Sequence, residues 1–139
     1  MGNSSGSTLK DLHVLILEDE ADTRELLAFL LQAEGAEVFP AQSVNEALQA
    51  LQQHRPDVIV ADIGLPEYNG YAFIAALRKH EDQRLRSTPV IALTAFSTAA
   101  DRDTALVSGF DVHLGKPFEP VELIATLRRL YDSRVHAAA

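Results

Sequence analysis

Cysteine is absent from the sequence, and no apolar run approaches the ~18 residues that a membrane-spanning helix requires. The first absence excludes disulfide bonds and thiolate metal sites and favours a reducing, cytoplasmic location, and the second argues against membrane insertion. Basic residues are also few, since 12 Lys and Arg stand against 20 Asp and Glu, for a formal net charge of −8. A direct nucleic-acid partner is therefore disfavoured, because phosphate binding requires a basic face.

The rest of the composition fits one globular domain. The 139 residues are 47% hydrophobic, which is enough for a single core. Residues 1–8 (MGNSSGST) lack the apolar segment of a secretory signal, and we expect a flexible leader there. Residues 9–133 form the expected domain, and residues 134–139 form an expected flexible tail.

Short apolar runs alternate with segments of helical periodicity along the domain. Strands are predicted at residues 13–17, 37–39, 57–62, 89–93 and 112–114, with Pro40 closing the second. Helices are predicted at residues 22–34, from an N-cap at Ser43 to residue 53, and at 71–79, 98–107 and 119–131. This order of five strand–helix units predicts an α/β fold with a parallel sheet covered by helices on both faces.

Polar residues follow the predicted strands at the carboxyl edge of the sheet, where functional groups gather in folds of this kind. Glu18 and Asp19 follow the first strand, and Asp62 ends the third. Two carboxylates brought to ~4 Å repel by about 4 kcal/mol at an effective dielectric of ~20, so three of them need protonation or a cation. Oxygen ligands without cysteine or histidine suit a hard divalent ion such as Mg²⁺.

Each of these residues also has an ordinary structural explanation. Asp19 is typical of a helix cap, and Asp62 is typical of a turn. Thr94 follows the fourth predicted strand and Lys116 follows the fifth, and either residue alone would be unremarkable. Together they are chemically coherent, because a carboxylate beside Mg²⁺ can act as a nucleophile toward phosphorus. The hydroxyl of Thr94, the backbone N–H of Ala95 and the charge of Lys116 could then stabilise a transferred phosphoryl group.

Four motifs, in this order, resemble the receiver domain of two-component response regulators over about residues 12–130. The motifs are Glu18-Asp19, DVIVADIGLPEYNG around Asp62, VIALTA with Thr94-Ala95, and GKPF with Lys116. The resemblance implies a flavodoxin-like (βα)5 fold with strand order 2-1-3-4-5. It also implies that Asp62 accepts a phosphoryl group from a histidine kinase or a histidine phosphotransfer protein.

The resemblance further implies a metal site. Asp19 and Asp62, helped by the carbonyl of Gly64, would bind Mg²⁺, with Mn²⁺ as a substitute, and Glu18 would act through a bound water. The first acid is Glu18 where the family usually has Asp, and the longer side chain extends its reach toward that water.

Around the phosphoryl group, the resemblance implies contacts from Thr94 and Lys116 and a Lys116–Pro117 bond that is commonly cis in the family. The bulky Phe96, two residues after Thr94, would shield the phosphoryl group from hydrolytic water. Three residues before the lysine, the family often carries Tyr or Phe, and here the residue is His113. The usual aromatic switch is therefore altered, and simple exposure of His113 at a strand end is the alternative.

The predicted function is a phosphorylation-controlled switch of protein–protein interactions that has no external turnover substrate. An aspartate-nucleophile phosphatase is the enzyme alternative, disfavoured because its second aspartate would stand at Gly64, and a non-phosphorylated interaction module is the third. The stretches TLKDLHVLILEDEADTRELL and GFDVHLGKPFEPVEL are similar to receivers at the C-terminus of hybrid histidine kinases, with a free-standing regulator as the alternative. The sequence leaves open the downstream partner and a homodimer formed through the last helix.

Overall fold

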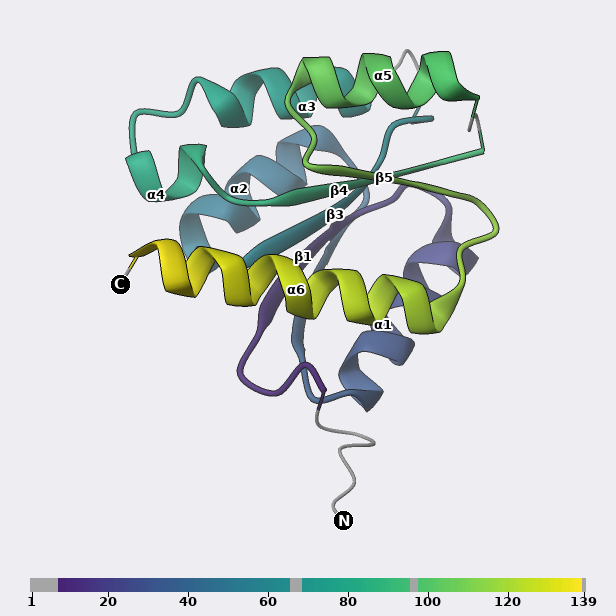
Figure 1. Ribbon diagram of the computed structural model, residues 1–139, viewed down its shortest axis with the longest axis vertical. Helices are drawn as coiled ribbons and strands as arrows, with labels where there is room; N and C mark the ends of the chain where they lie inside the picture. Colours follow the sequence, from purple (N-terminus) through teal and green to yellow (C-terminus); the bar gives the residue numbers. More distant parts are fainter. Residues whose placement is uncertain (1–7, 66–68, 96–97, 139) are drawn as a thin grey trace.

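The computed structural model describes residues 8–65, 69–95 and 98–138, and in this part of the chain five strands and six helices follow one another (Figure 1). The strands are β1 (His13–Leu17), β2 (Glu37–Ala41), β3 (Val58–Asp62), β4 (Val90–Thr94) and β5 (Val112–Gly115). The helices are α1 (Ala21–Ala33), α2 (Val44–His54), α3 (Asn69–Arg78), α4 (Gln83–Arg86), α5 (Ala99–Ser108) and α6 (Pro120–Ala138). The expected leader, up to residue 7, lies outside the described residues.

All five strands are parallel, and their order is β2-β1-β3-β4-β5. The predicted α/β class and the flavodoxin-like strand order are therefore confirmed. Leu17 pairs with Ala61, so that β1 and β3 end at the same level, and Thr94 pairs with Gly115 at the ends of β4 and β5. Residues that follow these strands consequently meet at one edge of the sheet.

The sheet separates two layers of core side chains. Successive residues of a strand point to opposite faces, so a strand buried on both faces is apolar throughout. Leu15 and Ile59 pack on the side of α2, α3 and α5, whereas Val14 and Val60 pack on the side of α1 and α6. Figure 1 shows the same two groups of helices on opposite sides of the sheet. This sandwich holds the strand ends in fixed positions.

Strand β2 continues through Pro40, where the sequence predicted its end. Pro40 pairs with Ile16, and Ala41 pairs with Leu17. Because β2 lies at the edge of the sheet, one of its sides has no neighbouring strand, and a proline without an N–H group is tolerated there. The prediction was wrong because the position of the strand in the sheet decides whether proline ends it.

Two helical segments differ from those predicted. The single turn α4 was missed, since four residues are too few for a periodic pattern, and it is fixed by its N-cap Asp82, which accepts hydrogen bonds from two backbone N–H groups. Helix α3 begins at Asn69 rather than at residue 71 as predicted, so that Asn69 and Gly70 belong to its first turn.

Helix α6 ends at Ala138 and not at Tyr131 as predicted, and residues 134–138, expected as a tail, continue the helix. The Arg134 guanidinium donates hydrogen bonds to the carbonyls of Asp57 and Arg84 at 3.3 and 2.7 Å. These tertiary contacts stabilise the last turns, which composition alone did not reveal. Neither α6, with its 19 residues, nor any other helix in the described part of the chain has the length and apolar character needed to cross a membrane.

Gly70 packs directly against the end of β3, and its substitution tests this contact. A Cβ at this position would lie 2.7 Å from both the carbonyl oxygen of Asp62 and the Cα of Ile63, and these backbone atoms cannot rotate away. We expect Gly70→Ala to lower the free energy of unfolding, measured by urea denaturation, by about 1–3 kcal/mol. The control Ala72→Ser, exposed on the same helix, should change it by less than about 0.5 kcal/mol. Wild-type stability of Gly70→Ala would contradict the packing.

Candidate functional site

Three carboxylates converge at the carboxyl edge of β1 and β3. Glu18 and Asp19 follow β1, Asp62 ends β3, and each offers an oxygen atom within 4.8 Å of the others. The exposed fraction is 1% for Glu18 and 7% for Asp62, whereas Asp19 is exposed. This acidic cluster (Glu18, Asp19 and Asp62) therefore has a buried side and a side open to solvent, and three carboxylate oxygens at this spacing fit a hard divalent cation.

The helix that follows β1 is capped by Glu20 and not by Asp19. The Glu20 carboxylate accepts a hydrogen bond from the Thr23 N–H at 2.8 Å and another from the Thr23 hydroxyl. The interpretation of Asp19 as a helix cap is therefore wrong. Asp19 contributes its carboxylate to the acidic cluster instead.

Lys116 connects the two buried carboxylates. Its ammonium donates hydrogen bonds to Glu18 Oε1 at 2.7 Å and to Asp62 Oδ2 at 3.0 Å. Glu18 Oε2 accepts from the Glu20 N–H at 3.1 Å, and Asp62 Oδ1 accepts from the Gly64 N–H at 2.8 Å. All four oxygens of the buried pair are thus hydrogen-bonded, as the burial of charged groups requires.

Burial and charge act in opposite directions on the ionisable groups of this site. Burial raises the pKa of Glu18, the hydrogen bonds from Lys116 and Glu20 oppose this rise, and the charge of Asp62 adds to it. Burial tends to lower the pKa of Lys116, but its hydrogen bonds to Glu18 and Asp62 outweigh this effect and raise the pKa. With three carboxylates and one ammonium, the ionised site carries two formal negative charges, which a divalent cation would balance.

The end of β4 lies beside Lys116. The Lys116 N–H donates a hydrogen bond to the Thr94 carbonyl at 2.9 Å, and Thr94 is buried opposite Gly115. The next residue, Ala95, is exposed. The Lys116–Pro117 peptide bond is cis. The structure therefore places the threonine and the lysine singled out in the sequence at the same edge as the acidic cluster.

Three further residues were predicted for the site: Gly64, His113 and Phe96. Gly64 is exposed, and a Cβ there would lie 3.3 Å from Asp62 Oδ1, so a side chain would crowd the carboxylate that the Gly64 N–H contacts. His113 is half-buried in β5, opposite Ala92, and its role as a switch stays a prediction. Phe96 lies outside the described residues.

Arg24 was not among the predicted site residues. Its guanidinium donates hydrogen bonds to the backbone carbonyls of Glu18 and Asp19 at 3.0 and 3.2 Å. These bonds hold the turn that carries the two acids. The sequence alone shows only an arginine in the first turn of the helix that follows β1. Arginine is common at exposed helix positions, so its presence does not predict this contact.

The fold and the acidic cluster define the class of flavodoxin-like α/β domains with an acidic site at the carboxyl edge of the sheet. Within this class, residues 14–128 match the family model of the response regulator receiver domain. The chain belongs to the response regulator receiver domain family, and the resemblance seen in the sequence is confirmed.

Individual relatives support this assignment. The chain is 40% identical over 122 residues to an uncharacterized 14.6 kDa protein in the sodA1 3′ region of Leptolyngbya boryana, covering 88% of this chain and 92% of that protein. It is 39% identical over 120 residues to response regulator Rre1 of Synechocystis, covering 86% of this chain and 51% of the relative, so it spans about half the length of Rre1. Among solved structures, it is similar to the receiver domain of sensor histidine kinase PA1611 from Pseudomonas aeruginosa PAO1, with a TM-score of 0.78 and 30% sequence identity. The similarity covers 87% of this chain and 98% of the PA1611 chain. The PA1611 structure has a magnesium ion coordinated in its active site cleft.

Removal of the Lys116 charge tests the electrostatics of the site. We expect Lys116→Met, without Mg²⁺ at pH 7, to lower the free energy of unfolding by about 3 kcal/mol, because it leaves two buried carboxylates without their counter-charge. Burial raises the pKa of Glu18 and Lys116 lowers it, so removal of Lys116 should raise this pKa further. Protonation of Glu18 as the pH falls toward 4.5 therefore favours folding more in the variant than in the wild type and should reduce this loss.

Urea denaturation at pH 7 and pH 5 measures both effects. Lys79→Met, which removes an exposed ammonium after α3, is the matched control and should change the unfolding free energy by less than about 0.5 kcal/mol. Equal losses in the two variants, or a loss in Lys116→Met that grows at pH 5, would contradict this account.

Proposed function

We propose that this receiver domain is a phosphoacceptor that takes a phosphoryl group on Asp62, in a Mg²⁺-dependent reaction, from a phosphohistidine of a histidine kinase or a histidine phosphotransfer protein. Phosphorylation would then change the proteins that the domain binds. The observation that carries the proposal is the position of Asp62, a buried carboxylate in the acidic cluster that is hydrogen-bonded to Lys116 at 3.0 Å.

In this reaction Asp62 is the nucleophile. One of its carboxylate oxygens forms the new bond to phosphorus while the phosphorus–nitrogen bond of the phosphohistidine breaks, and the departing imidazole nitrogen takes up a proton. Lys116, now shared between Glu18 and Asp62, would donate to an oxygen of the incoming phosphoryl group. The hydroxyl of the neighbouring Thr94 would supply a second donor.

The acidic cluster fits the metal that this reaction needs. Mg²⁺ is usually held by one or two carboxylates and several waters, and the exposed Asp19 leaves room for water while Glu18 and Asp62 form the buried side. When bound, the ion would neutralise the charge between the carboxylate nucleophile and the phosphoryl oxygens. The magnesium ion in the PA1611 receiver domain, 30% identical to this chain, supports the proposal; Mn²⁺ is expected to substitute.

Phosphatase activity is less well supported. An aspartate-nucleophile phosphatase needs a second acid two residues after the nucleophile, and the residue there is Gly64, whose N–H donates to Asp62. We therefore propose a switch without an external turnover substrate. The alternative of a non-phosphorylated module gives no role to Asp62 and Lys116, which lie together with two further acids at one edge.

Phosphorylation by a small phosphodonor tests the role of Asp62. With acetyl phosphate and Mg²⁺, intact-protein mass spectrometry should show wild-type protein that has gained one phosphoryl group, and chelation of Mg²⁺ should prevent the gain. Asp62→Asn should gain none, because an amide oxygen is a poor nucleophile. The matched control Asp103→Asn, exposed on α5, should behave as wild type. Equal labelling of Asp62→Asn and wild type would reject the proposal.

A further inference from the structure

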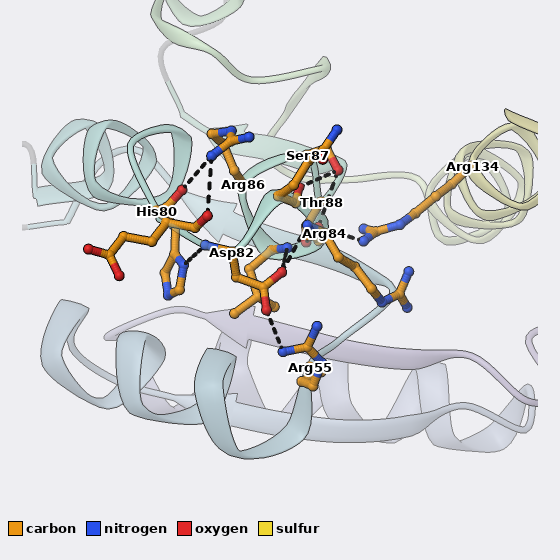
Figure 2. A network of polar contacts seen from close by, with 11 residues as sticks. Arg55, His80, Asp82, Arg84, Arg86, Ser87, Thr88 and Arg134 are labelled. Atoms are coloured by element: carbon orange, nitrogen blue, oxygen red, sulfur yellow. Dashed lines mark hydrogen bonds and ion pairs between the residues drawn. The ribbon is translucent and has the colours of Figure 1, made fainter. Parts of the chain in front are cut away.

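Arginine side chains gather at the end of the sheet opposite the acidic cluster. The arginine network consists of Arg55, Arg78, Arg84, Arg86 and Arg134, which surround the segments leading into β3 and β4. Figure 2 labels Arg55, Arg84, Arg86 and Arg134, and shows Arg134 reaching toward Arg84. A local excess of positive charge is unexpected in a chain with a net charge of −8, and it requires a physical reason.

The carboxylates of the network do not balance its guanidinium groups. Three arginines form ion pairs: Arg55 with Asp82 at 2.9 Å, Arg78 with Asp111 at 2.9 Å, and Arg84 with Asp57 at 3.1 Å. Arg86 donates to the carbonyl of His80, and Arg134 donates only to carbonyls. No carboxylate of the described residues lies within 4.0 Å of a nitrogen of either side chain. Five cations against three anions leave two positive charges.

Arg134 has no carboxylate within ion-pair distance among the described residues, and the nearby charge of Asp57 only partly offsets the arginines around it. It is half-buried, and burial, followed by the positive charge of Arg84, lowers its pKa. Its acceptors are the carbonyls of Asp57 and Arg84, at 3.3 and 2.7 Å, which are dipoles and not charges. An anion beside Arg134 would relieve both the repulsion between the two guanidinium groups and the loss of hydration.

A cavity of about 690 Å³ opens beside Arg84 and Arg134, within the range of roughly 300–1,000 Å³ typical of small-molecule sites. Gln83 and Ser133 line it with polar groups, together with Ser87, whose hydroxyl donates to the carbonyls of Gln83 and Arg84, and Leu130 adds an apolar wall. Asp111 also lines the cavity, but its Oδ2 already accepts hydrogen bonds from Arg78 at 2.9 Å and from the Val90 N–H at 2.8 Å. The cavity therefore offers donors for an anion together with a surface for an apolar group.

We propose that this cavity binds a small phosphate-bearing anion, either free phosphate or a nucleoside monophosphate, between Arg84 and Arg134. A phosphate monoester carries about −1.5 to −2 charges at pH 7, and the cavity presents two guanidinium charges, Arg134 without a carboxylate partner and Arg84 beside Asp57. The planar guanidinium group pairs with two phosphate oxygens at once. This site is separate from Asp62 and does not depend on the function proposed for it.

Nuclear magnetic resonance of the full chain, at low salt and without Mg²⁺, tests the proposal. Titration with inorganic phosphate and, separately, with adenosine monophosphate should give saturable shifts at the amides of Gln83, Ser87 and Ser133. Tighter binding of the monophosphate would assign the site to nucleotides, and equal affinities would assign it to free phosphate. Shifts confined to Gly64 and Thr94 would place the anion at the acidic edge and overturn the proposal.

Three variants make the test specific. Arg134→Gln should weaken binding by at least about tenfold, because it removes a charge-assisted hydrogen bond. Arg129→Gln, an exposed arginine on the same helix, is the matched control and should leave affinity unchanged. Ser133→Glu places a negative charge in the cavity and leaves both arginines in place. This variant should abolish binding of the anion, and its unfolding temperature should stay near that of wild type.

Three further results would overturn the proposal. The first is the absence of saturable shifts with either ligand. The second is an equal loss of affinity in Arg129→Gln and Arg134→Gln, since this would indicate attraction to net charge and not to the cavity. The third is binding of an aspartate-rich peptide at these amides while neither phosphate binds, because the surface would then recognise an acidic protein segment.

Discussion

The ion pairs that Lys116 makes with Glu18 and Asp62 are the interaction on which the site depends. Two carboxylates that are 1% and 7% exposed would repel each other and lack hydration, and the shared ammonium removes most of both penalties. It also links residues that lie 98 and 54 positions apart in the sequence, so it can form only when the ends of β1, β3 and β5 meet at one edge. The charge pairing of the site therefore depends directly on the order of the strands in the sheet.

The two ends of the sheet carry opposite charge. At the carboxyl edge, three acids and one lysine leave a negative site, which is held in place by the bonds from Arg24 to the backbone of Glu18 and Asp19. At the opposite end, five arginines exceed their three carboxylate partners. The parallel strands connect the two ends through buried apolar residues, so each end favours ligands of the opposite charge, a cation at the acidic edge and an anion at the arginine-rich end.

The sequence was sufficient for the class of fold because apolar strands and periodic helices alternate without interruption, and the strand-end position of Asp62, Thr94 and Lys116 follows from that pattern. It was insufficient where a tertiary contact overrides a local preference. Pro40 stays in β2 because β2 is an edge strand, and α6 continues to Ala138 where Arg134 contacts α4. Likewise, the Glu20 cap and the arginine cavity depend on distances that no local pattern contains.

We expect a divalent cation to supply the counter-charge that the acidic cluster requires. Isothermal titration of the chain with Mg²⁺ tests it directly. We expect one ion per chain and an affinity at least about tenfold weaker in Asp19→Asn. Asp22→Asn, which changes an exposed acid in the first turn of α1 outside the cluster, should keep wild-type affinity. Equal affinities in these two variants, or no saturable binding by the wild-type chain, would contradict it.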